Sequence, residues 1–185
     1  DAFCDRFAAK VATMPTGDPR QDGAPLGAVV DMRTVTHVNA LIADALAKGA
    51  VLRSGGPAEN VLMPATVIDR VSKGMAIYGD ESFGPVVAII RVRDEEDAVR
   101  VANDSDYGLS AAVFTRDAAR GLAVARRIRS GICHVNGPTV HDEAQMPFGG
   151  VGASGYGRFG GKAGIDSFTE LRWITIESQP GHYPI

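Results

Sequence analysis

The sequence predicts an α/β fold, in which a parallel sheet is connected by helical crossovers and one further strand follows near the C-terminus. Three apolar stretches have the composition of buried strands: "PVVAIIRV" (85–92), "LSAAVFT" (109–115) and "ICHVN" (132–136). The segments between them have helical periodicity, and strands joined by single helices are typical of a parallel sheet with right-handed crossovers. "RWITIES" (172–178) alternates instead, which predicts a half-exposed strand outside that sheet.

Two helices are predicted before the first of these strands. The first covers residues 2–14, because apolar residues recur there at helical spacing: Phe3, Phe7, Val11 and Met14. The second follows Thr34 as N-cap and ends at Gly49, which would adopt a left-handed conformation. After it, "AVLRSGG" reads as a short strand and turn, and "LMPATVI" as an extended segment that its proline interrupts.

The helices between the strands have clear boundaries in the sequence. Asp94 is the predicted N-cap of a helix over 95–103. Asp117 is the predicted N-cap of the next helix, which would continue to about Arg129 and end at Gly131. A short helix is also expected in "GKAGIDSFTEL", just before the alternating segment.

Composition limits the classes of protein that fit. The 185 residues have an ordinary hydrophobic content of 45% and a net charge of −3, which gives no electrostatic reason to expect nucleic acid or an anionic membrane as a partner. Apolar runs such as "PVVAII" are too short to span a bilayer. Two cysteines, Cys4 and Cys133, form no disulfide framework, so a cytoplasmic location is expected. Because Asp1 opens the chain almost inside a helix, we expect a piece of a longer protein.

The segment "PFGGVGASGYGRFGG" (147–161) matches the dinucleotide-binding pattern G-x-G-x-x-G twice. That pattern needs a strand directly before it and a helix that opens at its third glycine. Here "VHDEAQMPF" is too polar for a strand, and "YGRFGGK" is a poor helix start. We therefore expect these glycines to permit unusual dihedral angles and close backbone approach rather than to bind phosphate.

"GDESFGPV" (79–86) offers one candidate cofactor contact. The ionised carboxylate of Glu81 could accept both hydroxyls of a vicinal diol such as a ribose, with Phe83 as a flat wall beside it. From composition alone, a surface acid and a core aromatic residue are the favoured interpretation.

Other chemistry is weakly supported. His134, His141, Asp142 and Glu143 lack metal-ligand spacing, so no metal site is predicted. Cys133 lies in an apolar strand, and a nucleophile needs an activating environment. Cys4 is next to Asp5, whose carboxylate opposes thiolate formation.

Four stretches together, in order and at family-like spacing, resemble the C-terminal part of the aldehyde dehydrogenase superfamily: "DESFGPV", "ANDSDYGLSAAVFTRD", "GICHVN" and "MPFGGVGASGYGRFGG". The resemblance runs the whole length of the chain. "HVNGPTVHDEAQMPFGG" and the endings "LRWITIE" and "GHYPI" are most similar to the aromatic-aldehyde branch, which includes salicylaldehyde, benzaldehyde and vanillin dehydrogenases.

The resemblance implies roles for particular residues. Glu81 would bind the nicotinamide ribose of NAD or NADP, and Phe83 would pack near the nicotinamide. Phe148 would line the tunnel where the aldehyde enters, and the loop with Val140, His141 and Asp142 would shape substrate choice. In two places the chain departs from many members of the family: it has Phe159 in place of a glutamate and Gly152 in place of a lysine.

The resemblance also implies an organisation and a reaction. Residues 1–168 would be the C-terminal part of a catalytic domain, and 169–185 an oligomerisation arm strand and tail that makes a homo-oligomer. The whole enzyme would oxidise an aldehyde, an aromatic one on the branch resemblance, to a carboxylate through a cysteine thiohemiacetal and thioester. The nucleophilic cysteine, the general-base glutamate and the cofactor domain would lie upstream, so the isolated chain is expected to be inactive. Two alternatives stay open: a non-catalytic oligomerisation module, and a complete dinucleotide-binding protein that uses the glycine stretch.

Overall fold

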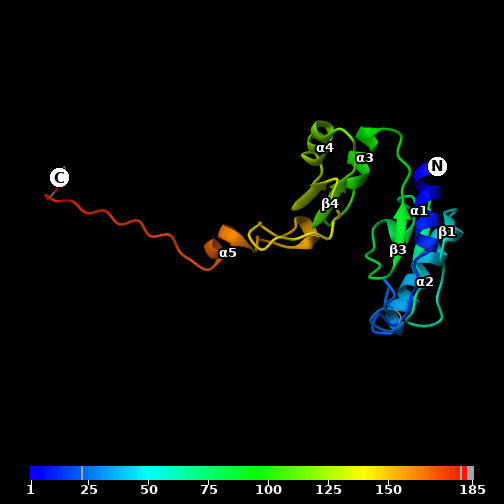
Figure 1. Cartoon of the computed structure of the whole chain (residues 1–185). Coiled ribbons are helices and arrows are strands. Elements are labelled where there is room, and N and C mark those ends of the chain that lie inside the picture. Colours follow the sequence, from blue (N-terminus) through cyan, green and yellow to red (C-terminus); the bar gives the residue numbers. More distant parts are fainter. Residues whose placement is uncertain (22, 180, 183–185) are drawn as a thin grey trace. The chain divides into compact units, whose positions relative to one another are not determined.

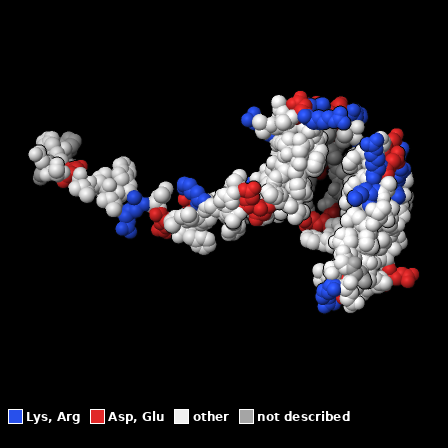
Figure 2. Space-filling view, in the orientation of Figure 1, with Lys and Arg blue, Asp and Glu red and all other residues white. Residues whose placement is uncertain are grey.

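The computed structural model describes residues 1–21, 23–179 and 181–182, and it divides into two compact units, Asp1–Ala98 and Val99–Ile185 (Figure 1). Within the described ranges, no helix is both long and apolar enough to cross a membrane. On the face shown in Figure 2, Lys and Arg side chains lie among Asp and Glu rather than in one continuous basic patch.

The first unit packs two helices against a mixed sheet. Its elements are α1 (Ala2–Ala12), α2 (Met32–Ala47), β1 (Val51–Ser54), β2 (Thr66–Asp69), the 3-10 turn η1 (Ala76–Tyr78) and β3 (Val86–Ile89). The strand order is β1-β2-β3; β1 is antiparallel to β2, and β2 is parallel to β3 with Thr66 opposite Val86. The core joins the buried face of α2 to the central strand, through residues such as Val38, Ile42 and Ile68.

The central strand β2 lies in and just after "LMPATVI", where only an extended segment interrupted by its proline was expected. All four of its residues are buried, although Asp69 is acidic and Pro64 precedes the strand. Because the strand begins at Thr66 and ends at Asp69, it lacks the continuous apolar run that predicts a buried strand.

The predicted apolar face of α1 is partly right, because Val11 is buried as expected but Phe3 is not. The helix buries Cys4, Ala8 and Val11, while Phe3 is 70% exposed and its ring stacks on that of Phe7 with centroids 5.6 Å apart. The small side chains of Cys4 and Ala8 allow the helix backbone to come close to β1 and β2, which it contacts. Side-chain size decides the buried face here, and a hydrophobicity pattern does not include size.

The ends of α2 differ in one detail from the prediction. The N-cap is Asp31 rather than Thr34, because the Asp31 carboxylate accepts a hydrogen bond from the Thr34 backbone N–H at 2.9 Å. Gly49 has a φ of +97°, as expected for the left-handed residue that follows a helix.

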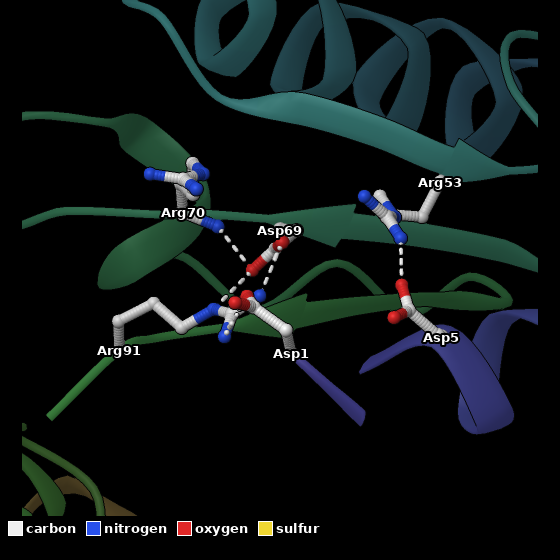
Figure 3. Close-up of polar contacts among 6 residues, drawn as sticks. All are labelled: Asp1, Asp5, Arg53, Asp69, Arg70 and Arg91. Atoms are coloured by element: carbon white, nitrogen blue, oxygen red, sulfur yellow. Dashed lines mark hydrogen bonds and ion pairs between the residues drawn. The ribbon is translucent and has the colours of Figure 1, made fainter. Parts of the chain in front are cut away.

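An ion pair between a buried carboxylate and a partly exposed guanidinium joins the end of β2 and the segment after β3 to the start of α1 (Figure 3). The Arg91 guanidinium donates from Nε and Nη2 to the two Asp69 carboxylate oxygens, at 2.8 and 2.7 Å. The Arg70 backbone N–H adds a third bond to that carboxylate, and Arg91 also reaches Asp1 at 3.0 Å. The Asp69 side chain is only 2% exposed, and the Arg91 guanidinium holds the pKa of its carboxyl well below the usual range. A second pair, Arg53 with Asp5, connects β1 to α1.

The second unit has a parallel pair of strands joined by one helix. Its elements are β4 (Ser110–Val113), α4 (Ala118–Ala125), β5 (Ile132–Val135), the 3-10 turn η2 (Gly152–Ser154) and α5 (Gly161–Ser167); α3 (Glu95–Ala102) contains the boundary with the first unit. β4 and β5 are parallel, with Ser110 opposite Ile132. The predicted caps are confirmed: Asp94 accepts from the Asp97 N–H at 2.8 Å, and Asp117 from the Arg120 N–H at 3.0 Å.

The α/β class with parallel pairing is confirmed, but the three strands expected in one series belong to two hydrogen-bonded sheets. β3 pairs with β2, whereas β4 pairs with β5. The helix after Asp117 also ends at Ala125, before the expected Arg129. The short helix predicted in "GKAGIDSFTEL" is α5.

The C-terminal segment forms no strand between residues 169 and 179, where a half-exposed one was expected (Figure 1). Its large apolar side chains are exposed on both faces rather than one: Leu171, Trp173, Ile174 and Ile176. A strand needs a neighbouring strand for its backbone hydrogen bonds, and the described chain supplies none here. Residues 180 and 183–185 of the predicted tail lie outside the described residues.

Candidate functional site

The glycine-rich segment folds back on itself after β5. Phe148 and Phe159 form an antiparallel bridge, with both N–H···O bonds at 2.8 Å. Between them, the Val151 N–H donates to Gly108 O and the Ala153 N–H to Asp106 O. These amides are therefore already bonded within the protein, whereas a phosphate cradle needs N–H groups that point at a ligand.

The glycines have the structural role that the sequence analysis expected. Gly152 has a φ of +62°, and a β-carbon there would overlap the Asp106 carbonyl oxygen. Gly131, at the start of β5, approaches the peptide of Gly149 and Gly150 so closely that a β-carbon would lie 2.7 Å from the Gly149 carbonyl carbon. Close backbone contact between β5 and the glycine segment is what fixes Phe148 beside the strand.

A cavity of about 430 Å³ lies along this strand in the second unit. Its lining is Gly131, Ile132, Cys133, His134, His141, Asp142, Glu143, Met146, Pro147 and Phe148. The structure thus brings together Phe148, His141 and Asp142 from the predicted substrate site. Val140 is 93% exposed and does not line this cavity, so its place in the substrate site stays a prediction. Its side chain is on the solvent side of the loop whose next residues face the cavity.

Cys133 and His134 also line the cavity, and neither was predicted to lie in the substrate site. They are neighbours on β5, and the alternation of a strand puts neighbours on opposite faces. The cavity nevertheless follows the strand from Gly131 to His134, so consecutive residues contribute to its wall. No pattern in the sequence indicates this. Burial raises the pKa of the Cys133 thiol, which opposes the thiolate that a nucleophile requires.

The two histidines of the cavity differ in their partners. Their rings meet edge to face, with centroids 5.6 Å apart and an interplanar angle of 80°. His141 Nε2 lies 3.4 Å from Glu143 Oε1, and both side chains are about half exposed. His134 Nε2 is buried and has no hydrogen-bond partner among the described residues. Among the residues that the structure describes, no group of three or more His, Cys, Asp or Glu has a geometry that could hold a metal ion.

The loop with Glu81 and Phe83 belongs to the first unit, and α2 anchors it. His37 Nε2 is 3.0 Å from the Glu81 backbone oxygen, and Gly84 packs so tightly on Val38 that a β-carbon would lie 2.6 Å from its Cγ2. The anchored backbone leaves the Glu81 side chain exposed, and its carboxylate bonds to none of the described residues.

Phe83 is 79% exposed, so the interpretation as a core aromatic residue is wrong. Its φ of +49° is uncommon for a residue with a side chain and costs of order 1–2 kcal/mol. Strained backbone of this kind gathers at ligand sites. An acceptor carboxylate and an exposed aromatic ring two residues away therefore fit a nicotinamide riboside, with the diol on Glu81 and the ring beside Phe83.

Residues 1–174, which include both sites, match the family model "Aldehyde dehydrogenase family". The chain belongs to this family. It is 55% identical over 185 residues to a vanillin dehydrogenase of Pseudomonas fluorescens and 46% identical to a salicylaldehyde dehydrogenase of Pseudomonas putida. In both cases the match covers 100% of this chain and 38% of the relative, so the chain spans well under half of the relatives' length.

Solved structures give the same result. A salicylaldehyde dehydrogenase from Pseudomonas putida G7, complexed with salicylaldehyde, matches all of the chain with a TM-score of 0.94 and 46% identity, over 38% of its own length. A Mycobacterium tuberculosis aldehyde dehydrogenase complexed with NAD+ matches 91% of the chain with a TM-score of 0.83 and 35% identity, over 36% of its own length. The predicted family and its aromatic-aldehyde relatives are confirmed.

Proposed function

We propose that this chain is part of an NAD(P)-dependent dehydrogenase that oxidises an aromatic aldehyde to a carboxylate. The supporting observation is the match of the whole chain to vanillin and salicylaldehyde dehydrogenases at 46–55% identity. In this proposal residues 1–168 complete a catalytic domain, and 169–185 are an arm that joins subunits. The nucleophilic cysteine is supplied by a part of the enzyme outside these 185 residues, because Cys4 is 1% exposed and Cys133 is an apolar-strand thiol.

Each site has a defined task in this reaction. NAD(P), when bound, supplies the acceptor for the hydride. Glu81 holds the nicotinamide ribose by its hydroxyls, and Phe83 restricts the nicotinamide ring from one side. Phe148 and His141 line the cavity that receives the aromatic ring. Both tasks are positioning, which lowers the barrier by orienting the reactants.

Oxidation by the full-length gene product tests the proposal. We expect aldehyde-dependent reduction of NAD or NADP at 340 nm with vanillin, salicylaldehyde or benzaldehyde, and none with the 185-residue chain alone. Reduction by the chain alone that is abolished by Cys133→Ala would contradict the proposed position of the nucleophile. A full-length enzyme inactive with all three aldehydes would contradict the substrate class.

Glu81→Gln should raise the KM for the cofactor about tenfold and leave the KM for the aldehyde unchanged. The amide keeps one acceptor oxygen but loses the charge-assisted hydrogen bonds to the ribose hydroxyls. Each such bond contributes roughly 1.5–3 kcal/mol to binding. Steady-state kinetics with varied NAD(P) measure the effect. Glu59→Gln, at another exposed glutamate of the same unit, is the matched control. Equal cofactor KM values for the two variants would show that Glu81 does not bind the cofactor.

The exposed apolar segment 169–179 favours a second candidate, a non-catalytic module that pairs copies of the chain. Unpaired backbone and large apolar side chains make such a segment a template for pairing with another strand. Light scattering of the chain should then show an oligomer that Trp173→Glu with Ile176→Glu dissociates. A monomer at all concentrations would count against the arm in both candidates.

A further inference from the structure

His134 carries a polar atom that the protein itself leaves unsatisfied. Its Nε2 is buried and has no partner among the described residues, although the ring lines the cavity. Buried polar groups in native proteins almost always have a hydrogen-bond partner, and each exception calls for an explanation. Because the ring lines a cavity, a bound molecule with a complementary group can supply the missing partner.

The chemistry of the cavity indicates what kind of molecule this is. Its volume of about 430 Å³ lies within the usual range for small-molecule sites. Met146, Pro147 and Phe148 provide apolar surfaces that suit a flat ring, and the polar groups lie at the histidines and the acidic loop. A ring with one hydrogen-bonding substituent therefore matches the lining better than an aliphatic chain or a multiply charged ligand.

Of the two histidines, His134 is the better hydrogen-bonding partner for such a substituent. His141 Nε2 already faces Glu143 at 3.4 Å, and the His141 side chain is 53% exposed, so water competes for it. His134 Nε2 is buried, where a hydrogen bond is stronger and its absence costs more. The edge-to-face contact with His141 restrains the His134 ring and so directs its nitrogen.

We propose that His134 is a specificity-determining residue that binds a phenolic hydroxyl on the aromatic ring of the substrate. A hydroxyl both donates and accepts, so it satisfies Nε2 in either tautomer of the imidazole. A site built to bond a hydroxyl discriminates against the analogue that lacks it, because the buried group is then left unpaired. This inference rests on the proposed function, since it specifies which aromatic aldehydes the enzyme prefers.

The test compares benzaldehyde with 2-, 3- and 4-hydroxybenzaldehyde in the full-length enzyme and in its His134→Phe and His134→Gln variants. Phe keeps a flat ring without nitrogen, whereas Gln keeps a nitrogen donor and an oxygen acceptor. We expect the preferred hydroxybenzaldehyde to exceed benzaldehyde in kcat/KM, and this ratio to fall about tenfold in His134→Phe but less than threefold in His134→Gln. Thermal unfolding shows whether each variant is folded.

Three results would overturn the inference: no hydroxyl preference in the wild type, a fall of less than threefold in His134→Phe, or an equal fall in His134→Gln. Calorimetric titration of the same aldehydes without cofactor separates this from the proposed function. An enzyme that binds with the predicted hydroxyl preference but oxidises none of the aldehydes retains the role of His134 and refutes the reaction. An enzyme that oxidises the aldehydes without a hydroxyl preference retains the proposed reaction and refutes the role of His134.

Discussion

Asp69→Asn is expected to lower the free energy of unfolding of the chain by about 2 kcal/mol, less than for a fully buried ion pair, because water still reaches the Arg91 side chain, which is 37% exposed. The carboxylate is 2% exposed and accepts two bonds from Arg91 and one from the Arg70 backbone. An amide has one acceptor oxygen, and its NH₂ group would face the guanidinium, which also only donates. Urea unfolding at pH 7 measures the loss.

The same pair predicts how stability depends on pH. The pKa of Asp69 is lower in the folded chain than in the unfolded one, chiefly because of its hydrogen bonds from Arg91. Its contribution is therefore fully present above the unfolded pKa, near 4 for an aspartate, and declines as the pH falls below that value. Wild-type stability should decrease more steeply than that of Asp69→Asn below pH 4.

Asp5→Asn is the control for this prediction. Asp5 pairs with Arg53 across the same helix and sheet, but its side chain is 59% exposed (Figure 3). Exposed pairs contribute little, because water and salt screen both charges. Asp5→Asn should lower the free energy of unfolding by only a small fraction of the decrease caused by Asp69→Asn. Equal losses, or the same acid dependence in wild type and Asp69→Asn, would show that burial does not set the value of the pair.

The sequence predicts features that depend on residues close together in the chain, and it misses those that depend on residues far apart. Asp94 and Asp117 were identified as caps because a cap bonds an N–H three residues away, within one local pattern. Asp69 and Arg91 are 22 positions apart, and nothing local in "TVIDR" indicates a buried, paired acid. The alternating "RWITIES" shows the related limit: its pattern is that of a strand, but whether it forms one depends on a neighbour.

The same distinction applies to the residues of the candidate site. Phe148 and His141 followed from family motifs, and the cavity contains both. Cys133 and His134 lie in it because the glycine segment packs along β5, which is a tertiary contact that strand alternation does not contain. Composition alone favours a buried Phe83, because a lone aromatic residue is usually buried, whereas a positive φ and the anchored loop leave this one exposed.

The contact between β5 and the glycine segment is the basis of the last prediction. Gly131→Ala should cost about 3 kcal/mol or more, at or above the upper end for added atoms in a packed interior. The added β-carbon would overlap Gly149 O and lie 3.0 Å from Gly150 Cα, and these are backbone atoms that cannot rotate away. Gly131 does not have a positive φ, so steric overlap alone determines the loss.

Gly164→Ala is the matched control. Gly164 lies inside α5, and a β-carbon there would meet nothing within 4 Å. Alanine favours a helix interior over glycine by up to ~1 kcal/mol, so this variant should be as stable as the wild type or slightly more stable. Urea unfolding of both variants measures the difference.

Amide hydrogen exchange shows where the cost of Gly131→Ala is located. The Val151 and Phe148 N–H groups bond to Gly108 O and Phe159 O, and they should exchange faster if the glycine segment separates from β5. Unchanged exchange together with unchanged stability would mean that the segment moves aside freely. Phe148 would then not be fixed beside His134, and the cavity wall would owe its shape to something other than the glycines. Faster exchange confined to these amides would instead make the seven-glycine stretch the scaffold of the aldehyde site.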